Sequence, residues 1–186
     1  MKKIIAILFL SVILCGCNDS DSDINRALEL RNNLISAKQC SFTVAITADY
    51  PSACYAFKMD CTSDDQGDIQ FVVKEPETIS GIAGQISGEG GKLTFEDKYL
   101  VFATMADGEI TPVSSPWLFL SALRSGYISG CAKEEDGMTI VCNDSYHDNQ
   151  AEVHIKTDSN CIPVAAEIYW QGRRVVTLIV ENFTIV

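Results

Sequence analysis

Residues 40–61 read CSFTVAITADYPSACYAFKMDC, in which two runs of alternating apolar and polar residues flank a turn with Asp49, Pro51 and Ser52. Alternation with a period of two predicts a pair of antiparallel strands that bury one face. The register that sorts the side chains most cleanly places four pairs on this face, namely Cys40–Cys61, Phe42–Met59, Val44–Phe57 and Ile46–Tyr55. Because a slip of one residue would exchange the two faces, the hairpin predicts a sheet with an apolar inner face.

The chain beyond this hairpin indicates strands nearly everywhere, with one helical interruption. Gln171 and Gly172 form a two-residue turn signal between the last two strand-like runs. The runs are separated by turn residues and cover positions 69–73, 78–86, 92–97, 98–105, 127–132, 138–144, 151–157, 162–170 and 173–185.

Two segments have helical patterns instead. Asp23 can cap a helix over residues 25–38, which carries one apolar stripe. The segment SSPWLFLSALRSG (114–126) has Ser115 at the N-cap and Pro116 at the first helical position. This second helix is apolar almost all round, so it is either buried on several sides or covers an apolar cavity.

The N-terminus has the features of an export signal. Lys2 and Lys3 precede an apolar run over residues 4–14, which is too short to span a membrane and suits a signal peptide. The run ends in LCGC (14–17), which resembles the lipobox of bacterial lipoproteins. We therefore expect cleavage before Cys17 and lipid attachment to that cysteine. An ordinary secretory signal that is cut nearby is the alternative.

This interpretation divides the chain into a signal peptide (1–16), a lipid-anchored tether (17–23) and one domain (24–186). Loss of Lys2 and Lys3 changes the formal net charge from −11 to −13. Such an acidic domain is not expected to bind nucleic acid. Acyl chains such as palmitate on Cys17 would hold it on the extracytoplasmic face of a bacterial membrane, because two or more chains anchor firmly.

Six cysteines remain beyond the proposed anchor, and in an exported chain an even number predicts three disulfides. The hairpin register above pairs Cys40 with Cys61. A second hairpin that turns at Asp136-Gly137 would set Cys131 opposite Cys142, which leaves Cys54 to pair with Cys161. There is no CxxC motif and there are only two histidines, so no metal and no other cofactor is expected.

Four segments carry a resemblance to the LolA/LolB lipoprotein-carrier superfamily, over residues 25–186. The helix that runs into a strand, LISAKQCSFTVAIT (34–47), resembles the opening of the family. The Lys74-Glu75-Pro76 step, followed by Ile79 and Gly81, is similar to the end of a long strand in these proteins. KLTFEDKYLVF (92–102) resembles the pair of strands that precedes the apolar helix of the family, and the C-terminal strands are similar too.

The resemblance implies an α+β fold, in which a curved antiparallel half-barrel is closed by helices and its concave face accommodates acyl chains. This chain departs from the soluble carriers at Glu77 and Thr78, where they often have an arginine, and in its six cysteines. The lipid anchor favours a membrane-bound acceptor or ligand holder over a shuttling carrier.

We therefore expect a lipoprotein that binds an acyl chain or another apolar ligand under a helical lid. The alternative is a structural or protein-interaction lipoprotein of the cell envelope, whose core is filled by its own side chains and whose partner the sequence does not name. Replacing Leu120 by Asp should then reduce ligand uptake more than stability. The residues expected to line or cap the cavity are Phe42, Val44, Ile46, Tyr55, Phe57, Met59, Trp117, Phe119, Leu120 and Leu123.

No enzymatic activity is expected from the sequence. The run Ser145-Tyr146-His147-Asp148 contains the residue types of a catalytic triad, but neighbours in one loop rarely reach the required geometry. Asp144, His147, Asp148 and His154 could be read as a metal site, although a solvated loop is the simpler interpretation.

Overall fold

The structure, a computed structural model, describes residues 19–96, 98–106, 108–143 and 151–186. Its helices are α2 (Asp19–Ser36) and α3 (Ser115–Ser125), with the short 3-10 helices η1 (Glu77–Ile79) and η2 (Pro112–Ser114). Its strands are β1 (Cys40–Asp49), β2 (Cys54–Ser63), β3 (Ile69–Glu75), β4 (Ala83–Ser87), β5 (Gly90–Phe95), β6 (Lys98–Phe102), β7 (Met105–Ala106), β8 (Glu109–Ile110), β9 (Tyr127–Glu134), β10 (Gly137–Asn143), β11 (Ala151–Thr157), β12 (Pro163–Trp170) and β13 (Arg173–Ile185).

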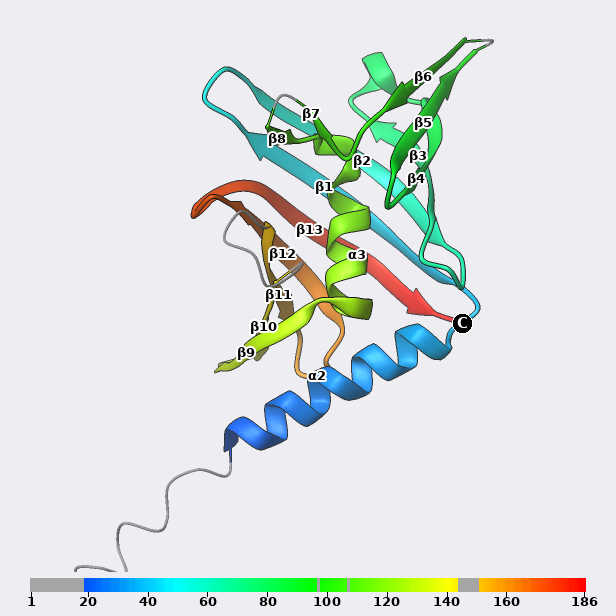
Figure 1. The fold of residues 1–186 in the computed structure, drawn as a ribbon. Coiled ribbons are helices and arrows are strands. Elements are labelled where there is room, and N and C mark those ends of the chain that lie inside the picture. Colours follow the sequence, from blue (N-terminus) through cyan, green and yellow to red (C-terminus); the bar gives the residue numbers. More distant parts are fainter. Residues whose placement is uncertain (1–18, 97, 107, 144–150) are drawn as a thin grey trace, which may run out of the picture.

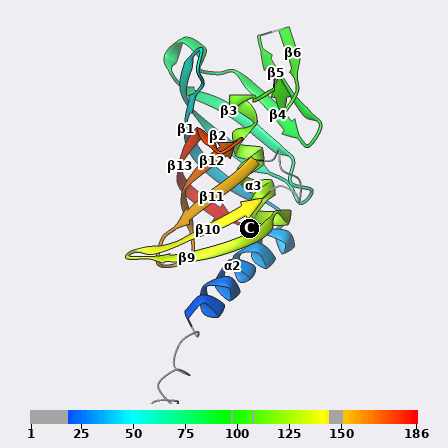
Figure 2. The same ribbon diagram turned by 60° about the vertical axis from the view of Figure 1, so that its left-hand side comes forward.

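One antiparallel sheet of eleven strands forms the body of the domain, in the order β6-β5-β4-β3-β2-β1-β13-β12-β11-β10-β9. The sheet curves without closing, α3 crosses its concave side, and α2 runs past one end (Figures 1 and 2). The C-terminus returns to the start of β1, because the backbone of Val186 bonds to that of Gln39. The expected α+β half-barrel is therefore confirmed.

The first hairpin has the predicted inner face but not the predicted register. Phe42 lies opposite Cys61, Val44 opposite Met59 and Ile46 opposite Phe57, so every pairing is displaced by two residues. The cause is a tighter turn, in which the Tyr50 amide donates to the carbonyl of Ala53 at 2.9 Å. A shift of two residues keeps each side chain on its face, so the alternating pattern alone could not exclude it.

Helix α2 begins at Asp19, six residues earlier than expected, so residues 19–23 are helical and do not form an extended tether. Acidic side chains near a helix N-terminus interact favourably with the helix dipole, and Asp23 is buried. Residues 1–18, with the proposed signal and Cys17, lie outside the described residues. Within the described part, no helix is long and apolar enough to cross a membrane.

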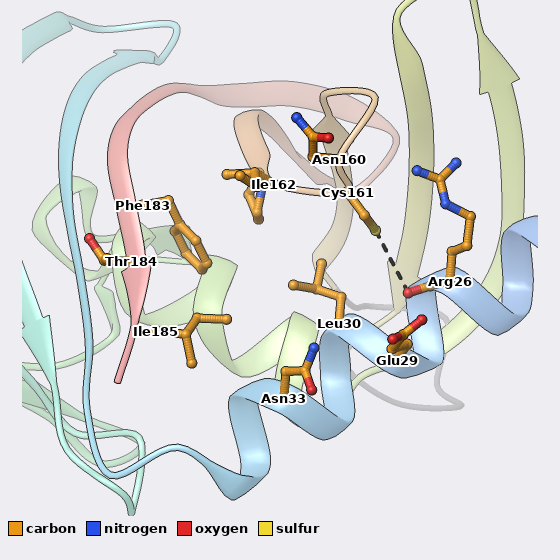
Figure 3. A pocket seen from close by; sticks show the side chains of 11 residues that line it. Arg26, Glu29, Leu30, Asn33, Asn160, Cys161, Ile162, Phe183, Thr184 and Ile185 are labelled. Carbon is orange, nitrogen blue, oxygen red and sulfur yellow. Dashed lines mark hydrogen bonds between the residues drawn. The ribbon is translucent and has the colours of Figure 1, made fainter.

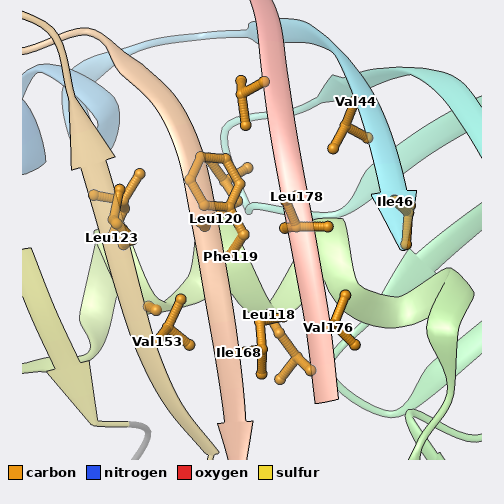
Figure 4. Close-up of a cluster of buried hydrophobic side chains, with 14 of the residues drawn as sticks. Val44, Ile46, Leu118, Phe119, Leu120, Leu123, Val153, Ile168, Val176 and Leu178 are labelled. Atoms are coloured by element: carbon orange, nitrogen blue, oxygen red, sulfur yellow. The ribbon is translucent and has the colours of Figure 1, made fainter. Parts of the chain in front are cut away.

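Helix α3 packs directly onto the concave face of the sheet (Figure 4). The side chains of Phe119 and Leu120 are completely buried, and Phe119 makes edge contacts with the rings of Phe42 and Phe183. Val44, Val153 and Ile168 of the facing strands belong to the same cluster of buried side chains. This half of the domain therefore has a core filled by its own side chains.

Two arginines join the C-terminal part of α2 to the C-terminal part of α3. Arg31 of α2 donates hydrogen bonds to the carbonyls of Leu123 and Gly126 at 2.7 Å and of Ala122 at 3.3 Å. Arg124 of α3 donates in return to the carbonyl of Leu34, near the end of α2, at 3.0 Å. Each arginine thus binds carbonyls at the C-terminal end of the other helix, where carbonyls such as those of Leu123 and Leu34 lack an i+4 amide partner within the helix.

Candidate functional site

A cavity of about 470 Å³ lies beside the part of the concave face that α3 covers. This volume is within the range of about 300–1,000 Å³ that is usual for small-molecule sites. Its lining is mostly aliphatic and aromatic, and consists of Tyr50, Ser52, Tyr55, Phe57, Phe71, Val73, Ile79, Ile82, Leu93, Ala106, Glu109, Ile110, Thr111, Pro112 and Val113. We refer to this space as the apolar cavity.

Strand β3 and the segment after it form one wall of the apolar cavity. Phe71 and Val73 alternate with exposed residues along β3, so both side chains face inward. Beyond η1 the chain returns to the strand, where the amide of Val73 donates to the carbonyl of Ile82 at 2.8 Å and the amide of Gly81 donates to that of Val73 at 2.9 Å. These bonds fix Ile79 and Ile82 as lining residues.

The opposite wall is formed by the small β7–β8 hairpin, a two-stranded sheet of its own, and by η2. The buried hydroxyl of Tyr50 donates a hydrogen bond to the carbonyl of Ile110 and so joins the β1–β2 turn to β8. Burial, together with the nearby Glu109 carboxylate and Tyr55 phenol, raises the pKa of Tyr50 to about 12. The phenol is therefore neutral at physiological pH and remains a donor.

Only two of the ten residues expected to contact a ligand line the apolar cavity, namely Tyr55 and Phe57. The other eight belong to the packed core or lie against it, and are Phe42, Val44, Ile46, Met59, Trp117, Phe119, Leu120 and Leu123. The reason is that α3 is in close contact with β10, β11 and β12, so its apolar face is covered by protein. The cavity opens instead beyond the N-terminal end of this helix.

Sequence reasoning missed most of the lining. The alternation of Phe71 and Val73 in strand β3 was a usable signal, since it marks an inward face. The two-residue strand that contains Ile110 is too short to have a detectable period. Its place in the wall depends on the contact with Tyr50, which is 60 residues away in the chain.

The first two predicted cysteine pairs are not directly opposed. Cys40 lies opposite Ser63, whereas Cys61 lies opposite Phe42. In the second hairpin the turn is formed by Glu135 and Asp136, so Cys131 lies opposite Ile140 and Cys142 opposite Ile128. The members of each pair are diagonal neighbours, which are about 7–8 Å apart and farther than a disulfide allows without movement. These two bridges therefore stay predictions.

The third predicted pair is not brought together. Cys54 lies opposite Asp49 at the β1–β2 turn. Cys161 lies just before β12, at the other end of the strands, and its thiol is directed at the carbonyl of Arg26 at 3.7 Å. All six cysteines in the described residues are free thiols. Burial raises the pKa of Cys40 to about 12 and that of Cys142 to about 11, so both are protonated and poorly nucleophilic at neutral pH.

A second cavity, of about 410 Å³, separates α2 from the ends of β12 and β13 (Figure 3). Phe183 and Leu30 face it from opposite sides, but its lining also includes Arg26, Glu29 and Asn33. The Arg26 guanidinium donates to the carbonyl of Ser159 at 2.7 Å across one end. With so many polar groups, this cavity suits an alkyl chain less well than the apolar cavity does.

The residues that could be read as catalytic or metal-binding do not form a described site. The run Asp144–Asp148, with the triad residue types, lies outside the described residues. Within the described part, no group of three or more histidine, cysteine, aspartate or glutamate side chains is placed to hold a metal ion. His154, on β11, instead contacts Glu152 at 2.5 Å and stacks on the ring of Tyr169.

An open antiparallel half-barrel with a helix across its concave face defines the class of LolA-like folds. No protein-family model matches the sequence, and no curated protein sequence matches it either. Among solved structures, the chain is similar to a domain described as an outer membrane lipoprotein-sorting protein from Vibrio parahaemolyticus, with a TM-score of 0.50 and 10% identity, covering 89% of this chain and 92% of that one.

A LolA superfamily protein from Nitrosomonas europaea is similar with a TM-score of 0.44 and 14% identity, over 86% of this chain and 93% of that one. The lipoprotein LppX from Mycobacterium tuberculosis is similar with a TM-score of 0.41 and 14% identity, over 87% of this chain and 93% of that one. The chain has a LolA-like fold, as the resemblance in its sequence implied.

Proposed function

We propose that this protein is a membrane-anchored lipoprotein of the bacterial cell envelope that binds an acyl chain or another apolar ligand in the apolar cavity. The observation that carries the proposal is the cavity itself, about 470 Å³ of space lined mainly by aliphatic and aromatic side chains. Each methylene that leaves water for such a space gains about 0.8 kcal/mol. An alkyl chain of ten methylenes therefore gains about 8 kcal/mol before the cost of association.

The alternative, a structural or protein-interaction lipoprotein, requires a core that is filled by its own side chains. The half of the domain under α3 meets this requirement, because Phe119 and Leu120 are fully buried there. The half that is bounded by β3 and the β7–β8 hairpin does not meet it. The unfilled half favours ligand binding.

Filling the apolar cavity should block ligand uptake. We expect Ile82→Trp to weaken binding of a fluorescent monoacylglycerol by about tenfold or more, because the added ring removes room for two or three methylenes. Binding is measured by fluorescence titration of protein stripped of bound lipid. The matched control is Val101→Trp on β6. Its side chain is 68% exposed and, because Val101 pairs with Lys92, lies on the opposite face of the sheet from the lining residue Leu93, so this variant should bind as the wild type does.

Two results would contradict the proposal. Equal uptake by the Ile82→Trp variant and the wild type would mean that the ligand lies elsewhere. No uptake by any variant, with no lipid in native mass spectra of protein from its own host, would favour the structural alternative.

Membrane anchoring is tested at Cys17. We expect Cys17→Ala to abolish metabolic labelling with a palmitate analogue and to leave the protein as a precursor or without lipid. Cys15→Ala is the control, because Leu14 is a poor residue at the cleavage position and Cys15 is therefore not the expected acylation site. Labelling that persists in Cys17→Ala and disappears in Cys15→Ala would show that Cys15, and not Cys17, is the acylated residue.

A further inference from the structure

We propose that the apolar cavity selects acyl ligands whose polar end donates hydrogen bonds, as an ammonium or hydroxyl group does, and discriminates against free fatty acids. The inference rests on the proposed function and adds the class of head group. It follows from how the polar groups of the lining are distributed and from the sign of their charge.

The polar groups of the lining gather at one end of the cavity, around the β1–β2 turn and β8. Ser52 belongs to the turn, and the rings of Tyr50 and Tyr55 lie next to each other with their centroids 6.2 Å apart. Glu109 precedes Ile110, whose carbonyl accepts the hydrogen bond from Tyr50. Tyr55 is 49% exposed, so this end is in contact with water and is where a head group would lie.

The charged acceptor of this polar end is the Glu109 carboxylate, whereas the hydroxyls of Ser52 and Tyr55 can either donate or accept. The Tyr50 hydroxyl hydrogen is already donated to the carbonyl of Ile110. Among the described residues, no side chain donates a hydrogen bond to the Glu109 carboxylate, and none forms an ion pair with it. A partly buried carboxylate without a partner gains from a donor, and most from a cation, because charge-assisted hydrogen bonds are the strongest.

Among the described residues that line the cavity, none carries a positive charge. Glu109 is the one acidic residue among the described lining residues, and the lining contains no lysine, arginine or histidine. Arg173, at the same end of the sheet, is engaged by Asp49, to whose backbone carbonyl it donates at 3.0 Å and whose carboxylate lies 3.7 Å away. A fatty-acid carboxylate would therefore face a like charge at reduced dielectric, which disfavours its ionised form.

The test compares three ligands whose chains have the same number of carbon atoms, namely hexadecylamine, monopalmitoylglycerol and palmitate, as competitors of a fluorescent monoacylglycerol at pH 7. We expect the amine and the glyceride to displace the probe from the wild-type protein at concentrations about tenfold lower than palmitate. Glu109→Gln keeps the shape of the side chain and removes its charge. In this variant, the concentrations of amine and of palmitate that displace the probe should differ by about threefold or less. The concentration of the glyceride that displaces the probe should stay nearly unchanged.

Glu135→Gln, in the β9–β10 turn and away from the cavity, is the matched control and should keep the full difference between amine and palmitate. Palmitate that competes as well as hexadecylamine, or a difference that is the same in Glu109→Gln and the wild type, would overturn the inference and leave acyl binding intact. If none of the three ligands displaces the probe, or the probe does not bind, the proposed function itself fails.

Discussion

Replacing Leu120 by Asp should unfold the domain rather than merely weaken ligand uptake. Leu120 is 0% exposed in the cluster between α3 and the sheet, so the variant loses a buried leucine and must bury a carboxyl group in its place. Together these effects cost about 5 kcal/mol or more. An ordinary domain has a stability of about 5–15 kcal/mol, so a loss of this size removes a third of it or more, and all of it at the lower end of the range.

Urea denaturation followed by circular dichroism measures this loss, with the cysteines kept in one redox state. Leu100→Asp on β6 makes the same chemical change at a side chain that is 59% exposed, and should alter the free energy of unfolding by about 0.5 kcal/mol or less. A Leu120→Asp protein that kept its stability and lost only uptake would restore the view of α3 as a lid over the ligand.

Removal of Arg31 should produce the second largest loss of stability. Its guanidinium is partly buried and donates to three carbonyls at the end of α3. Arg31→Met leaves the carbonyls of Leu123 and Gly126 without this donor, whereas the carbonyl of Ala122 keeps the amide of Gly126. Hydrogen bonds from charged donors contribute about 1.5–3 kcal/mol each when well made. Allowing for partial replacement by water, we expect the free energy of unfolding to fall by about 2–3 kcal/mol.

Arg26→Met serves as the control, because Arg26 is also on α2 but donates only to the carbonyl of Ser159, in an exposed position. Its loss should be about 1 kcal/mol or less. Both variants are compared by thermal and chemical denaturation. Equal losses in the two variants would show that the bonds to α3 contribute nothing beyond the ordinary value of an arginine on this helix.

The sequence predicted the outline of the fold because its signals are local. Alternation in residues 40–61 predicted the correct inner face, and Gln171-Gly172 predicted the turn that the structure has, with positive φ angles of 51° and 75°. It could not predict the register, because a pattern with a period of two is unchanged by a shift of two residues. The expected Cys40–Cys61 pair depended on that register, so the two residues are diagonal and not directly opposed.

The candidate site was harder to predict for a different reason. An apolar helix such as 115–125 must be covered by something apolar, but the pattern does not distinguish a ligand from the protein's own strands. Trp117 and Phe119 were therefore assigned to a cavity that lies elsewhere. Phe57, by contrast, lines the apolar cavity, and its contact with a ligand stays a prediction. Glu109 had no sequence signal, since its position depends on contacts between distant segments.

The early start of α2 has a consequence for the proposed lipid anchor, because it limits how far the domain could move from the membrane. Helix begins at Asp19, so only one residue separates it from the proposed anchor at Cys17. Two residue steps span about 7 Å at most, whatever their conformation. With the proposed anchor in place, almost no flexible linker separates the domain from the lipid. The domain would then stay at the surface of its own membrane. A ligand would have to be delivered to it there and could not be collected from a second membrane.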